Sequence, residues 1–162
     1  MGTEYSETKQ RYAQMAFDTL CLALDDMRWT YNRDAANKVV TTSAVGKDLK
    51  MELRMVVNEE RQLMYIKSPM PFNVPPSKRD TIGKALHFAN FSILNGCFEY
   101  DQSAGKIGFK IVVPYFDSQL SKEVYRYAVV LTCSMVDKFN DKLLSVIHGE
   151  MTLEEFRDFA NK

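Results

Sequence analysis

Residues that could carry acid–base or metal chemistry are few and far apart in this sequence. His87 and His148 are its two histidines, and neither has a second histidine or a cysteine at the spacing of a metal site. His87 stands among apolar residues of a predicted helix, which favours a partly buried side chain over a general base. His148 falls at the predicted end of another helix, where an imidazolium ring interacts favourably with the helix dipole. The histidines therefore predict neither a metal centre nor a catalytic base.

Thiols, carboxylates and glycine-containing turns also predict no site for chemistry. Cys97 has no histidine close to it in the sequence, so a buried thiol is favoured over a nucleophile. Glu99 and Asp101 share a predicted strand, whereas the other carboxylates are scattered in a manner typical of solvated faces and helix caps. Three Gly-Lys pairs, which begin at residues 46, 83 and 105, lack the spacing of a phosphate-binding loop. We therefore expect no enzymatic activity, no metal and no cofactor.

Composition limits the class of protein further. The chain has 162 residues, of which 46% are hydrophobic and 26% charged, as expected for one packed domain over residues 1–162. Its 21 Lys and Arg residues balance its 21 Asp and Glu residues, so no net charge attracts nucleic acid or an anionic membrane. An exposed Tyr65 could stack on a base, but the basic surroundings of a nucleic-acid site are missing. We therefore expect neither nucleic acid nor a membrane as a partner.

The sequence also predicts a cytoplasmic location. The first ten residues lack the basic start and the apolar run typical of a signal peptide. The longest apolar stretch, residues 127–136, is far shorter than the ~20 residues that span a bilayer. Cys21, Cys97 and Cys133 are odd in number and widely spaced, which favours reduced thiols over disulfides.

Hydrophobic periodicity predicts an α+β fold. Apolar residues three and four apart indicate helices, alternation indicates strands, and Gly, Asn and Pro mark the turns between them. The predicted helices cover residues 8–27, 77–94, 121–147 and 153–160, and the predicted strands cover residues 38–45, 49–57, 62–67, 97–101 and 106–113. The proline-rich residues 68–80 are expected to form a stiff connection. The order α-β-β-β-α-β-β-α-α predicts a five-stranded, twisted antiparallel sheet with helices packed on it.

Two of the predicted helices carry more apolar surface than one sheet can cover. The helix over residues 77–94 has one apolar stripe that contains Leu86 and a second that contains Phe88 and Phe91. The helix over residues 121–147 is apolar almost all round between residues 127 and 136. Two interpretations stay open: the helices are sandwiched between the sheet and their neighbours, or they form the seam of a homodimer.

Several segments of the chain resemble the YbjN-domain family. They are Leu94–Asn95, Gly96–Asp101, Gly105–Phe109 and the stretch from Asp137 to Gly149. This family is described as bacterial sensory transduction regulators, and its fold is similar to that of class I chaperones of type III secretion systems, in which helices pack on a twisted antiparallel sheet, usually in a dimer. The resemblance covers about residues 29–149 and implies a non-catalytic adaptor or chaperone-like module that presents a sheet face or a helix groove to another protein.

These considerations define two candidate sites. The predicted dimer seam uses the second helix and the hairpin Phe98–Val113, with the residues Ile82, Leu86, Ala89, Phe91, Ile93 and Phe98. The predicted partner-binding strip lies in the proline-rich segment, where Met70, Phe72 and Val74 are apolar residues in extended geometry. The alternative for this strip is that its side chains plug the edge of the sheet.

A second hypothesis, from a different class, is a small-molecule-binding sensor or an enzyme with a pocket between helix and sheet. A ligand present at one hundred times its Kd should stabilise the fold by about 2.7 kcal/mol. A thermal-shift screen against a metabolite panel therefore separates this hypothesis from the protein-binding one.

Overall fold

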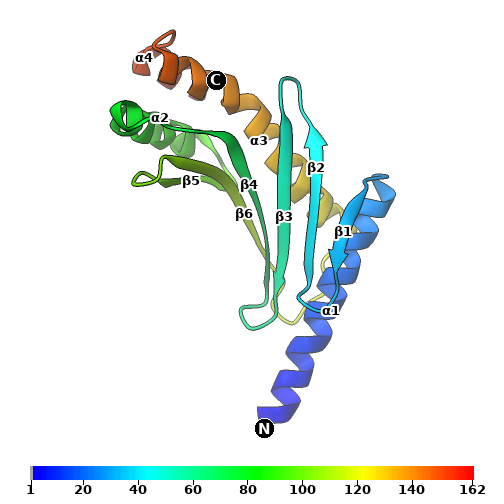
Figure 1. Cartoon of the computed structure of the whole chain (residues 1–162). Coiled ribbons are helices and arrows are strands. Elements are labelled where there is room, and N and C mark those ends of the chain that lie inside the picture. The colour runs from blue at the N-terminus through cyan, green and yellow to red at the C-terminus, as the bar shows by residue number, and fades with distance from the viewer. Residues whose placement is uncertain (1) are drawn as a thin grey trace.

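The computed structural model describes residues 2–162, with side chains described from Ser6 onward. Its strands are β1 (Tyr31–Asp34), β2 (Val39–Val45), β3 (Lys50–Asn58), β4 (Leu63–Asn73), β5 (Cys97–Asp101) and β6 (Lys106–Pro114). Its helices are α1 (Gly2–Asp26), α2 (Arg79–Ser92), α3 (Lys122–His148) and α4 (Leu153–Ala160), with a 3-10 turn η1 (Pro76–Lys78) before α2. Over this range the strands form one six-stranded sheet in the order β1-β2-β3-β4-β6-β5, with every neighbouring pair antiparallel (Figure 1). The α+β class is the one that the sequence predicts.

One face of the sheet is buried and the other is open. Along β3 the buried side chains of Met51, Leu53 and Met55 alternate with exposed polar ones. The register continues this buried face across the sheet, because Met55 lies opposite Val40 on β2 and opposite Ile66 on β4. Since successive side chains of a strand point to opposite faces, the intervening residues of every strand form the open face.

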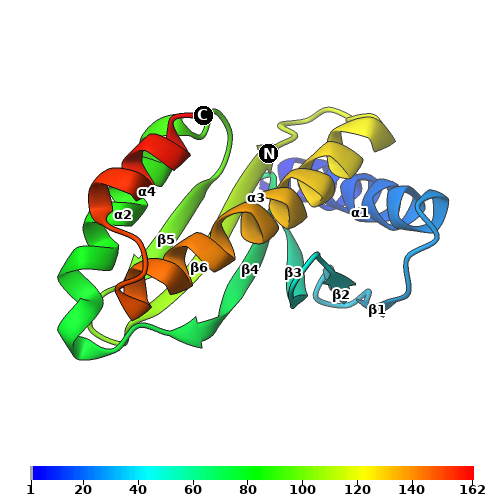
Figure 2. The same ribbon diagram turned by 90° about the horizontal axis from the view of Figure 1, so that it is seen from above.

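The helices cover the buried face (Figures 1 and 2). α3 runs across β4 and β6, α1 packs against α3 and β3, and α2 packs against β5 and α3. α4 packs on α2 and α3 rather than on the sheet. With 27 residues, α3 is about 40 Å long, which lets one helix contact the sheet and three other helices. Most of its apolar surface is therefore sandwiched within the chain, which was the first of the two interpretations of its sequence.

Aromatic side chains join the last helix to the sheet. Phe98 on β5 meets Phe109 on β6 and Phe139 on α3 edge to face, with ring centroids 5.2 and 5.3 Å apart. Phe139 in turn contacts Phe156 and Phe159 of α4. Edge-to-face pairs are worth about 0.5–1.5 kcal/mol each beyond the area that they bury, so this cluster fixes α4 against the body of the chain.

The strand pattern differs from the prediction at two places. β1 was not predicted because Tyr31–Asp34 is short and polar and shows no alternation of apolar and polar residues. β4 continues through Pro69 and Pro71 to Asn73, although proline cannot donate a ladder hydrogen bond. The register between β4 and β6 shifts between Pro69 and Asn73, and this irregularity accommodates the prolines.

The helix ends follow the sequence at α3 and α4 but not at α2. Ser77, the first residue of the predicted second helix, lies inside η1, and among the described residues no side chain caps α2. Thr152 and Glu155 form a capping box at the start of α4. Gly149 ends α3 in the left-handed conformation, with φ of 77°.

Candidate interaction surfaces

Burial affects two of the three thiols of the chain. Among the side chains of residues 6–162, no group of three or more His, Cys, Asp or Glu could hold a metal ion. Burial, reinforced by the nearby Asp137, raises the pKa of the Cys133 thiol to about 11, and burial also raises the pKa of Cys21. Both thiols are therefore protonated at neutral pH, the unreactive form. No helix of the described chain combines the length and apolarity needed to cross a bilayer.

The structure divides the six residues of the predicted dimer seam between core and surface. Four of them are buried within the chain itself: Ile82, Leu86, Ala89 and Phe98. They face the sheet and its neighbouring helices, so they present no surface to a second copy, which corrects this part of the expected seam. Phe91 is 84% exposed and Ile93 is half-buried. The apolar pattern of α2 identified a buried stripe correctly but could not show what covers it.

The predicted partner-binding strip is also placed mostly in the core. Met70 and Val74 are buried and Phe72 is half-buried. Met70 and Phe72 lie on β4, whose side chains alternate between the buried and the open face, and Val74 directly follows this strand. The Val74 N–H donates a hydrogen bond to the Gly105 carbonyl at 2.8 Å, which ties the end of the strip to the β5–β6 turn. The side chains of Met70 and Phe72 thus lie on the buried face of β4, an interior strand of the sheet, and not at a sheet edge.

A groove with a mixed polar and apolar lining lies on the helical side, between the end of α2, the middle of α3 and the end of α4. We call it the helix groove. It has a volume of about 340 Å³, and its apolar lining is contributed chiefly by Ile93, Leu94, Tyr127, Leu131 and Met135. Leu94 is fully exposed and Tyr127 is half exposed. The charged side chains at its rim are Lys138 and Lys162. The groove contains Ile93 of the predicted seam and adjoins Phe91 along the chain.

The β5 edge of the sheet is closed by a side chain of α2. The Phe98 N–H donates a hydrogen bond to Asn90 Oδ1 at 2.7 Å, and Asn90 Nδ2 donates one to the Phe98 carbonyl at 3.0 Å. The amide of Asn90 therefore satisfies the backbone N–H and carbonyl that Phe98 would direct to a neighbouring strand if β5 were not at the edge. Because exposed strand edges pair readily with other chains, this contact protects β5 from strand addition.

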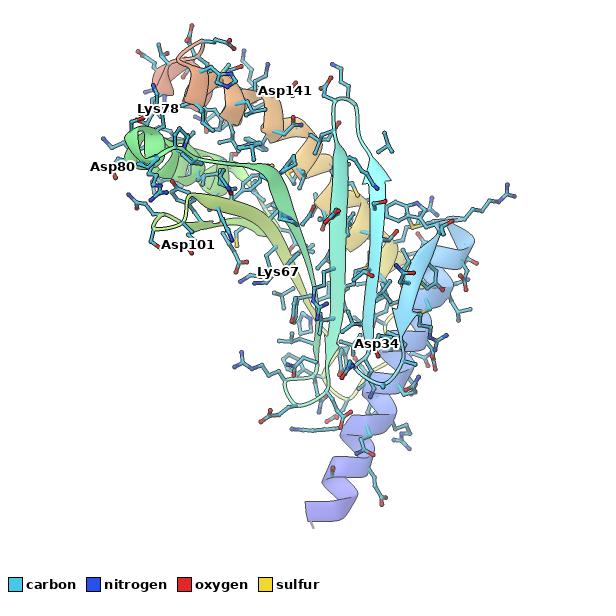
Figure 3. The ribbon with its side chains drawn as sticks, viewed as in Figure 1. Asp34, Lys67, Lys78, Asp80, Asp101 and Asp141 are labelled. Carbon is cyan, nitrogen blue, oxygen red and sulfur yellow. The ribbon has the colours of Figure 1, made fainter. Side chains whose placement is uncertain are left out.

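The open face of the sheet is hollowed over β2, β3 and β4. The hollow has a volume of about 1040 Å³, and its floor and walls include Trp29, Thr41, Glu52, Arg54 and Lys67. Figure 3 shows Lys67 on the side of the sheet away from α3. The hollow is lined by hydroxyl groups, charged side chains and apolar side chains that include Trp29, Val45 and Leu53.

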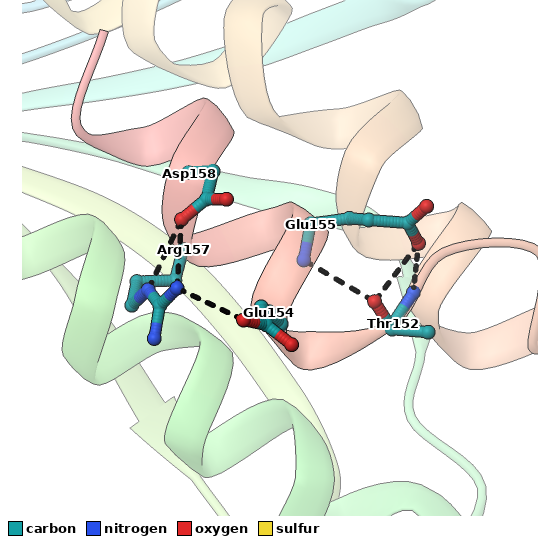
Figure 4. A network of polar contacts seen from close by, with 5 residues as sticks. All are labelled: Thr152, Glu154, Glu155, Arg157 and Asp158. Atoms are coloured by element: carbon teal, nitrogen blue, oxygen red, sulfur yellow. Dashed lines mark hydrogen bonds and ion pairs between the residues drawn. The ribbon is translucent and has the colours of Figure 1, made fainter.

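A third depression of about 880 Å³ lies at the surface between α2, β5 and α4. Lys84 and Arg157 line it, and carboxylates of its own helix bind Arg157: the guanidinium lies 2.9 Å from Asp158 and 3.5 Å from Glu154 (Figure 4). Figure 4 also shows the adjacent capping box, in which Thr152 and Glu155 exchange hydrogen bonds at the start of α4. The arrangement stabilises α4 and leaves no unpaired charge on Arg157 to recognise a ligand.

Comparison with known proteins places the fold. No protein-family model matches the sequence, and no curated protein matches it. Among solved structures, the chain is similar to YbjN, a proposed transcription regulator from E. coli, with a TM-score of 0.56 and 13% identity over 82% of this chain and 92% of YbjN. It has a YbjN-like fold. It also aligns with the ExsC–ExsE complex, with a TM-score of 0.40 and 11% identity over 64% of this chain and 75% of that chain.

The YbjN-like fold confirms the resemblance that the sequence suggested, and it does so for the backbone arrangement. At 13% identity the side chains differ, so a functional assignment depends on the surfaces of this chain. Periodicity marked residues 127–136 of α3 as apolar, but it gave no sign that Leu94 would join Tyr127 and Leu131 across the groove. The charged residues of the open face were missed because cross-strand register cannot be read from sequence.

Proposed function

We propose that this chain is a non-catalytic protein-binding module that acts as a homodimer in a regulatory setting. The observation that carries the proposal is the helix groove, where fully exposed Leu94 and half-exposed Tyr127 stand beside half-buried Leu131 and Met135. Contiguous apolar surface of this kind marks sites of protein association. The proposed dimer seam keeps Phe91 and Ile93 of the sequence prediction and replaces its four buried members by these α3 residues and Leu94.

A second copy is the occupant that best fits the groove. In a twofold-symmetric dimer every groove residue contributes twice, because the same patch is used on both copies. Full burial of one Leu side chain stabilises a contact by about 1.5–3 kcal/mol, so two copies of Leu94 alone supply a substantial part of what association requires. Lys138 and Lys162 lie at the rim, where like charges on two copies are screened by water and salt.

Light scattering on the purified chain tests the dimer. We expect wild type to elute with a mass of twice 18.7 kDa, and the Leu94→Asp variant with a mass of 18.7 kDa. Because Leu94 is fully exposed, the substitution leaves the fold intact, whereas an Asp at buried Leu86 would unfold the chain. Val45→Asp is the matched control, since Val45 is also an exposed apolar residue, 85% exposed, but lies on β2 away from the groove.

The dimer proposal has two refuting outcomes. One is a wild-type chain that stays monomeric across an about hundredfold range of concentration. The other is a dimer that survives Leu94→Asp and is lost in Val45→Asp, which would move the seam to the other side of the molecule.

The proposal also includes a cytoplasmic location and a regulatory role. The location is supported by the three cysteines, none of which forms a disulfide within residues 6–162. The regulatory role is supported by the fold shared with YbjN, a proposed transcription regulator. A fluorescent fusion followed by fractionation tests the location, and recovery with the membrane or the periplasm would contradict it.

A further inference from the structure

Three cations stand side by side on the open face of the sheet, in an arrangement that disfavours the fold. Arg54 on β3 lies directly opposite Lys67 on β4, and Lys67 lies directly opposite Lys110 on β6. We call these three residues the basic row. Like charges directly opposite on neighbouring strands are destabilising. Because the chain has as many carboxylates as cations, its composition does not require two such like-charge pairs in succession.

Close ion pairs compensate only one end of the basic row. The Glu99 carboxylate on β5 forms ion pairs with both lysines, at 2.6 Å from Lys110 Nζ and 2.9 Å from Lys67 Nζ. Among residues 6–162, no carboxylate lies within ion-pairing distance of Arg54, although Glu52 lies two residues away on the same strand. At longer range Arg54 interacts with Asp34, whose pKa is lowered chiefly by hydrogen bonds from Asn37 and also by the charge of Arg54. By contrast, Arg33 and Arg157 each pair with an aspartate at 2.9 Å. Arg54 is therefore a cation held next to another cation, on the floor of the 1040 Å³ hollow.

An apolar row runs parallel to the basic row. Val56, Tyr65 and Val112 are in register across β3, β4 and β6, two residues further along each strand. Val112 is exposed, and Val56 and Tyr65 are half-buried. Two residues of a strand span about 7 Å, so the cations and the apolar side chains lie side by side on one surface. A ligand that covers both rows needs carboxylates along one flank and apolar groups along the next.

We propose that the open face binds an amphipathic helix of a partner protein, with acidic residues on the basic row and apolar residues on the apolar row. This inference rests on the proposed protein-binding function and names the chemistry of the partner. Neighbouring strands are about 4.8 Å apart, and residues three or four apart on a helix advance by about 4.5–6 Å along its axis. A helix laid across the strands therefore brings successive carboxylates over successive cations.

Other occupants fit the open face less well. A second copy of the chain would oppose the same three cations with three identical ones. Nucleic acid would match the charge, but it would leave the apolar row uncovered, and the chain has no net positive charge to attract it. An acidic amphipathic helix satisfies both rows at once.

The test uses a fluorescent synthetic helix of about 16 residues, with Glu along one flank and Leu along the adjacent flank, at low salt. Its control is the same peptide with Gln in place of Glu. We expect wild type to bind the Glu peptide more tightly than the Gln peptide, and added salt to reduce the difference. Arg54→Gln should weaken binding of the Glu peptide about fivefold. Arg61→Gln, an exposed arginine in the β3–β4 turn, should leave it unchanged.

Stability measured on the same variants separates a binding role from a structural one. Arg54→Gln removes a like-charge pair, so it should raise the melting temperature while it weakens peptide binding. Glu99→Gln removes the partner of both lysines, so it should lower the melting temperature while it strengthens peptide binding. A residue that acts only through the fold would move both quantities in the same direction.

Three results would overturn the inference. They are equal affinity for the Glu and Gln peptides, unchanged peptide binding by Arg54→Gln, and tighter binding of a single-stranded oligonucleotide that Arg54→Gln abolishes. Light scattering on the same samples keeps the two proposals apart. A wild-type dimer that ignores the peptide refutes the open-face inference alone, and a wild-type monomer that binds the Glu peptide refutes the dimer alone.

Discussion

Two buried tyrosines give a direct test of how polar groups contribute to this fold. Tyr115 and Tyr125 are both fully buried, and burial raises the pKa of each to about 12. Their hydroxyls differ in one respect. Tyr115 Oη donates a hydrogen bond to the Asn58 carbonyl at 3.1 Å, whereas Tyr125 Oη has no hydrogen-bond partner among the described residues. Replacing each by Phe removes one hydroxyl and keeps the ring, so the pair isolates the effect of that hydrogen bond.

The two substitutions should change stability in opposite directions. A hydrogen bond contributes about 1 kcal/mol net, so Tyr115→Phe should lower the free energy of unfolding by about that amount. A buried hydroxyl without a partner costs about 1–3 kcal/mol, so Tyr125→Phe should raise the free energy of unfolding by about 1 kcal/mol or more. For a chain of this length, each kcal/mol shifts the melting temperature by about 2–4 °C.

Urea denaturation followed by circular dichroism measures both effects, with the slope of the transition held as a check that the two-state description applies. Two buried tyrosines that lose equal stability on substitution by Phe would refute the reasoning, because the absence of a partner for Tyr125 would then have no energetic consequence. Alkaline titration adds a second measurement. The folded pKa values lie above the ordinary value of 10, so stability should fall as pH rises from 10 towards 12. The loss should be smaller in Tyr125→Phe, because one buried titrating hydroxyl is gone.

Two further predictions concern the edge and the open face of the sheet. Asn90→Leu leaves the Phe98 N–H and carbonyl without partners, so it should lower the free energy of unfolding by about 2 kcal/mol and promote concentration-dependent association, with Asn90→Asp intermediate because it keeps the acceptor. Denaturation and light scattering check this, and an Asn90→Leu variant as stable as wild type would exclude an energetic role for the edge contact. Burial alone would raise the pKa of Glu99, but the hydrogen bonds from Lys110 and Lys67 outweigh it and lower the pKa, so this carboxylate stabilises the fold above its ordinary pKa and that contribution is lost as pH falls below it. Melting temperatures between about pH 5 and pH 3 should therefore fall less steeply for Glu99→Gln than for wild type, and parallel curves would contradict the ion-pair account.

Local patterns predicted the helices of this chain well because each has its own signal. The capping box at Thr152 and the glycine after His148 fix helix ends through hydrogen bonds made within a few residues. The strands were predictable only where side chains alternate, as on β3. β1 and the second half of β4 form through pairing with β2 and β6, so their own sequences carry no local pattern that predicts a strand.

The interaction surfaces were harder to predict for the same physical reason. Apolar spacing on α2 shows that Leu86 and Phe91 lie on different stripes. Only the packed structure shows that the first stripe is covered, and that in the second Phe88 is half-buried and Phe91 exposed. The basic row is assembled from residues 54, 67 and 110, which no sequence motif connects. The equal numbers of acidic and basic residues in the whole chain gave no indication that three cations would lie in one row.

The helix groove and the basic row lie on opposite sides of the sheet, so the proposed module can use both at the same time. The helix groove belongs to the layer formed by α2, α3 and α4, whereas the basic row belongs to the open face. A dimer built on the groove therefore leaves both open faces free, one on each copy. Because sites this far apart with no shared contacts act independently in energetic terms, the dimer would present two equal binding faces rather than one composite site. A bivalent partner that carries two acidic helices would then gain affinity from effective concentration, without any new contact.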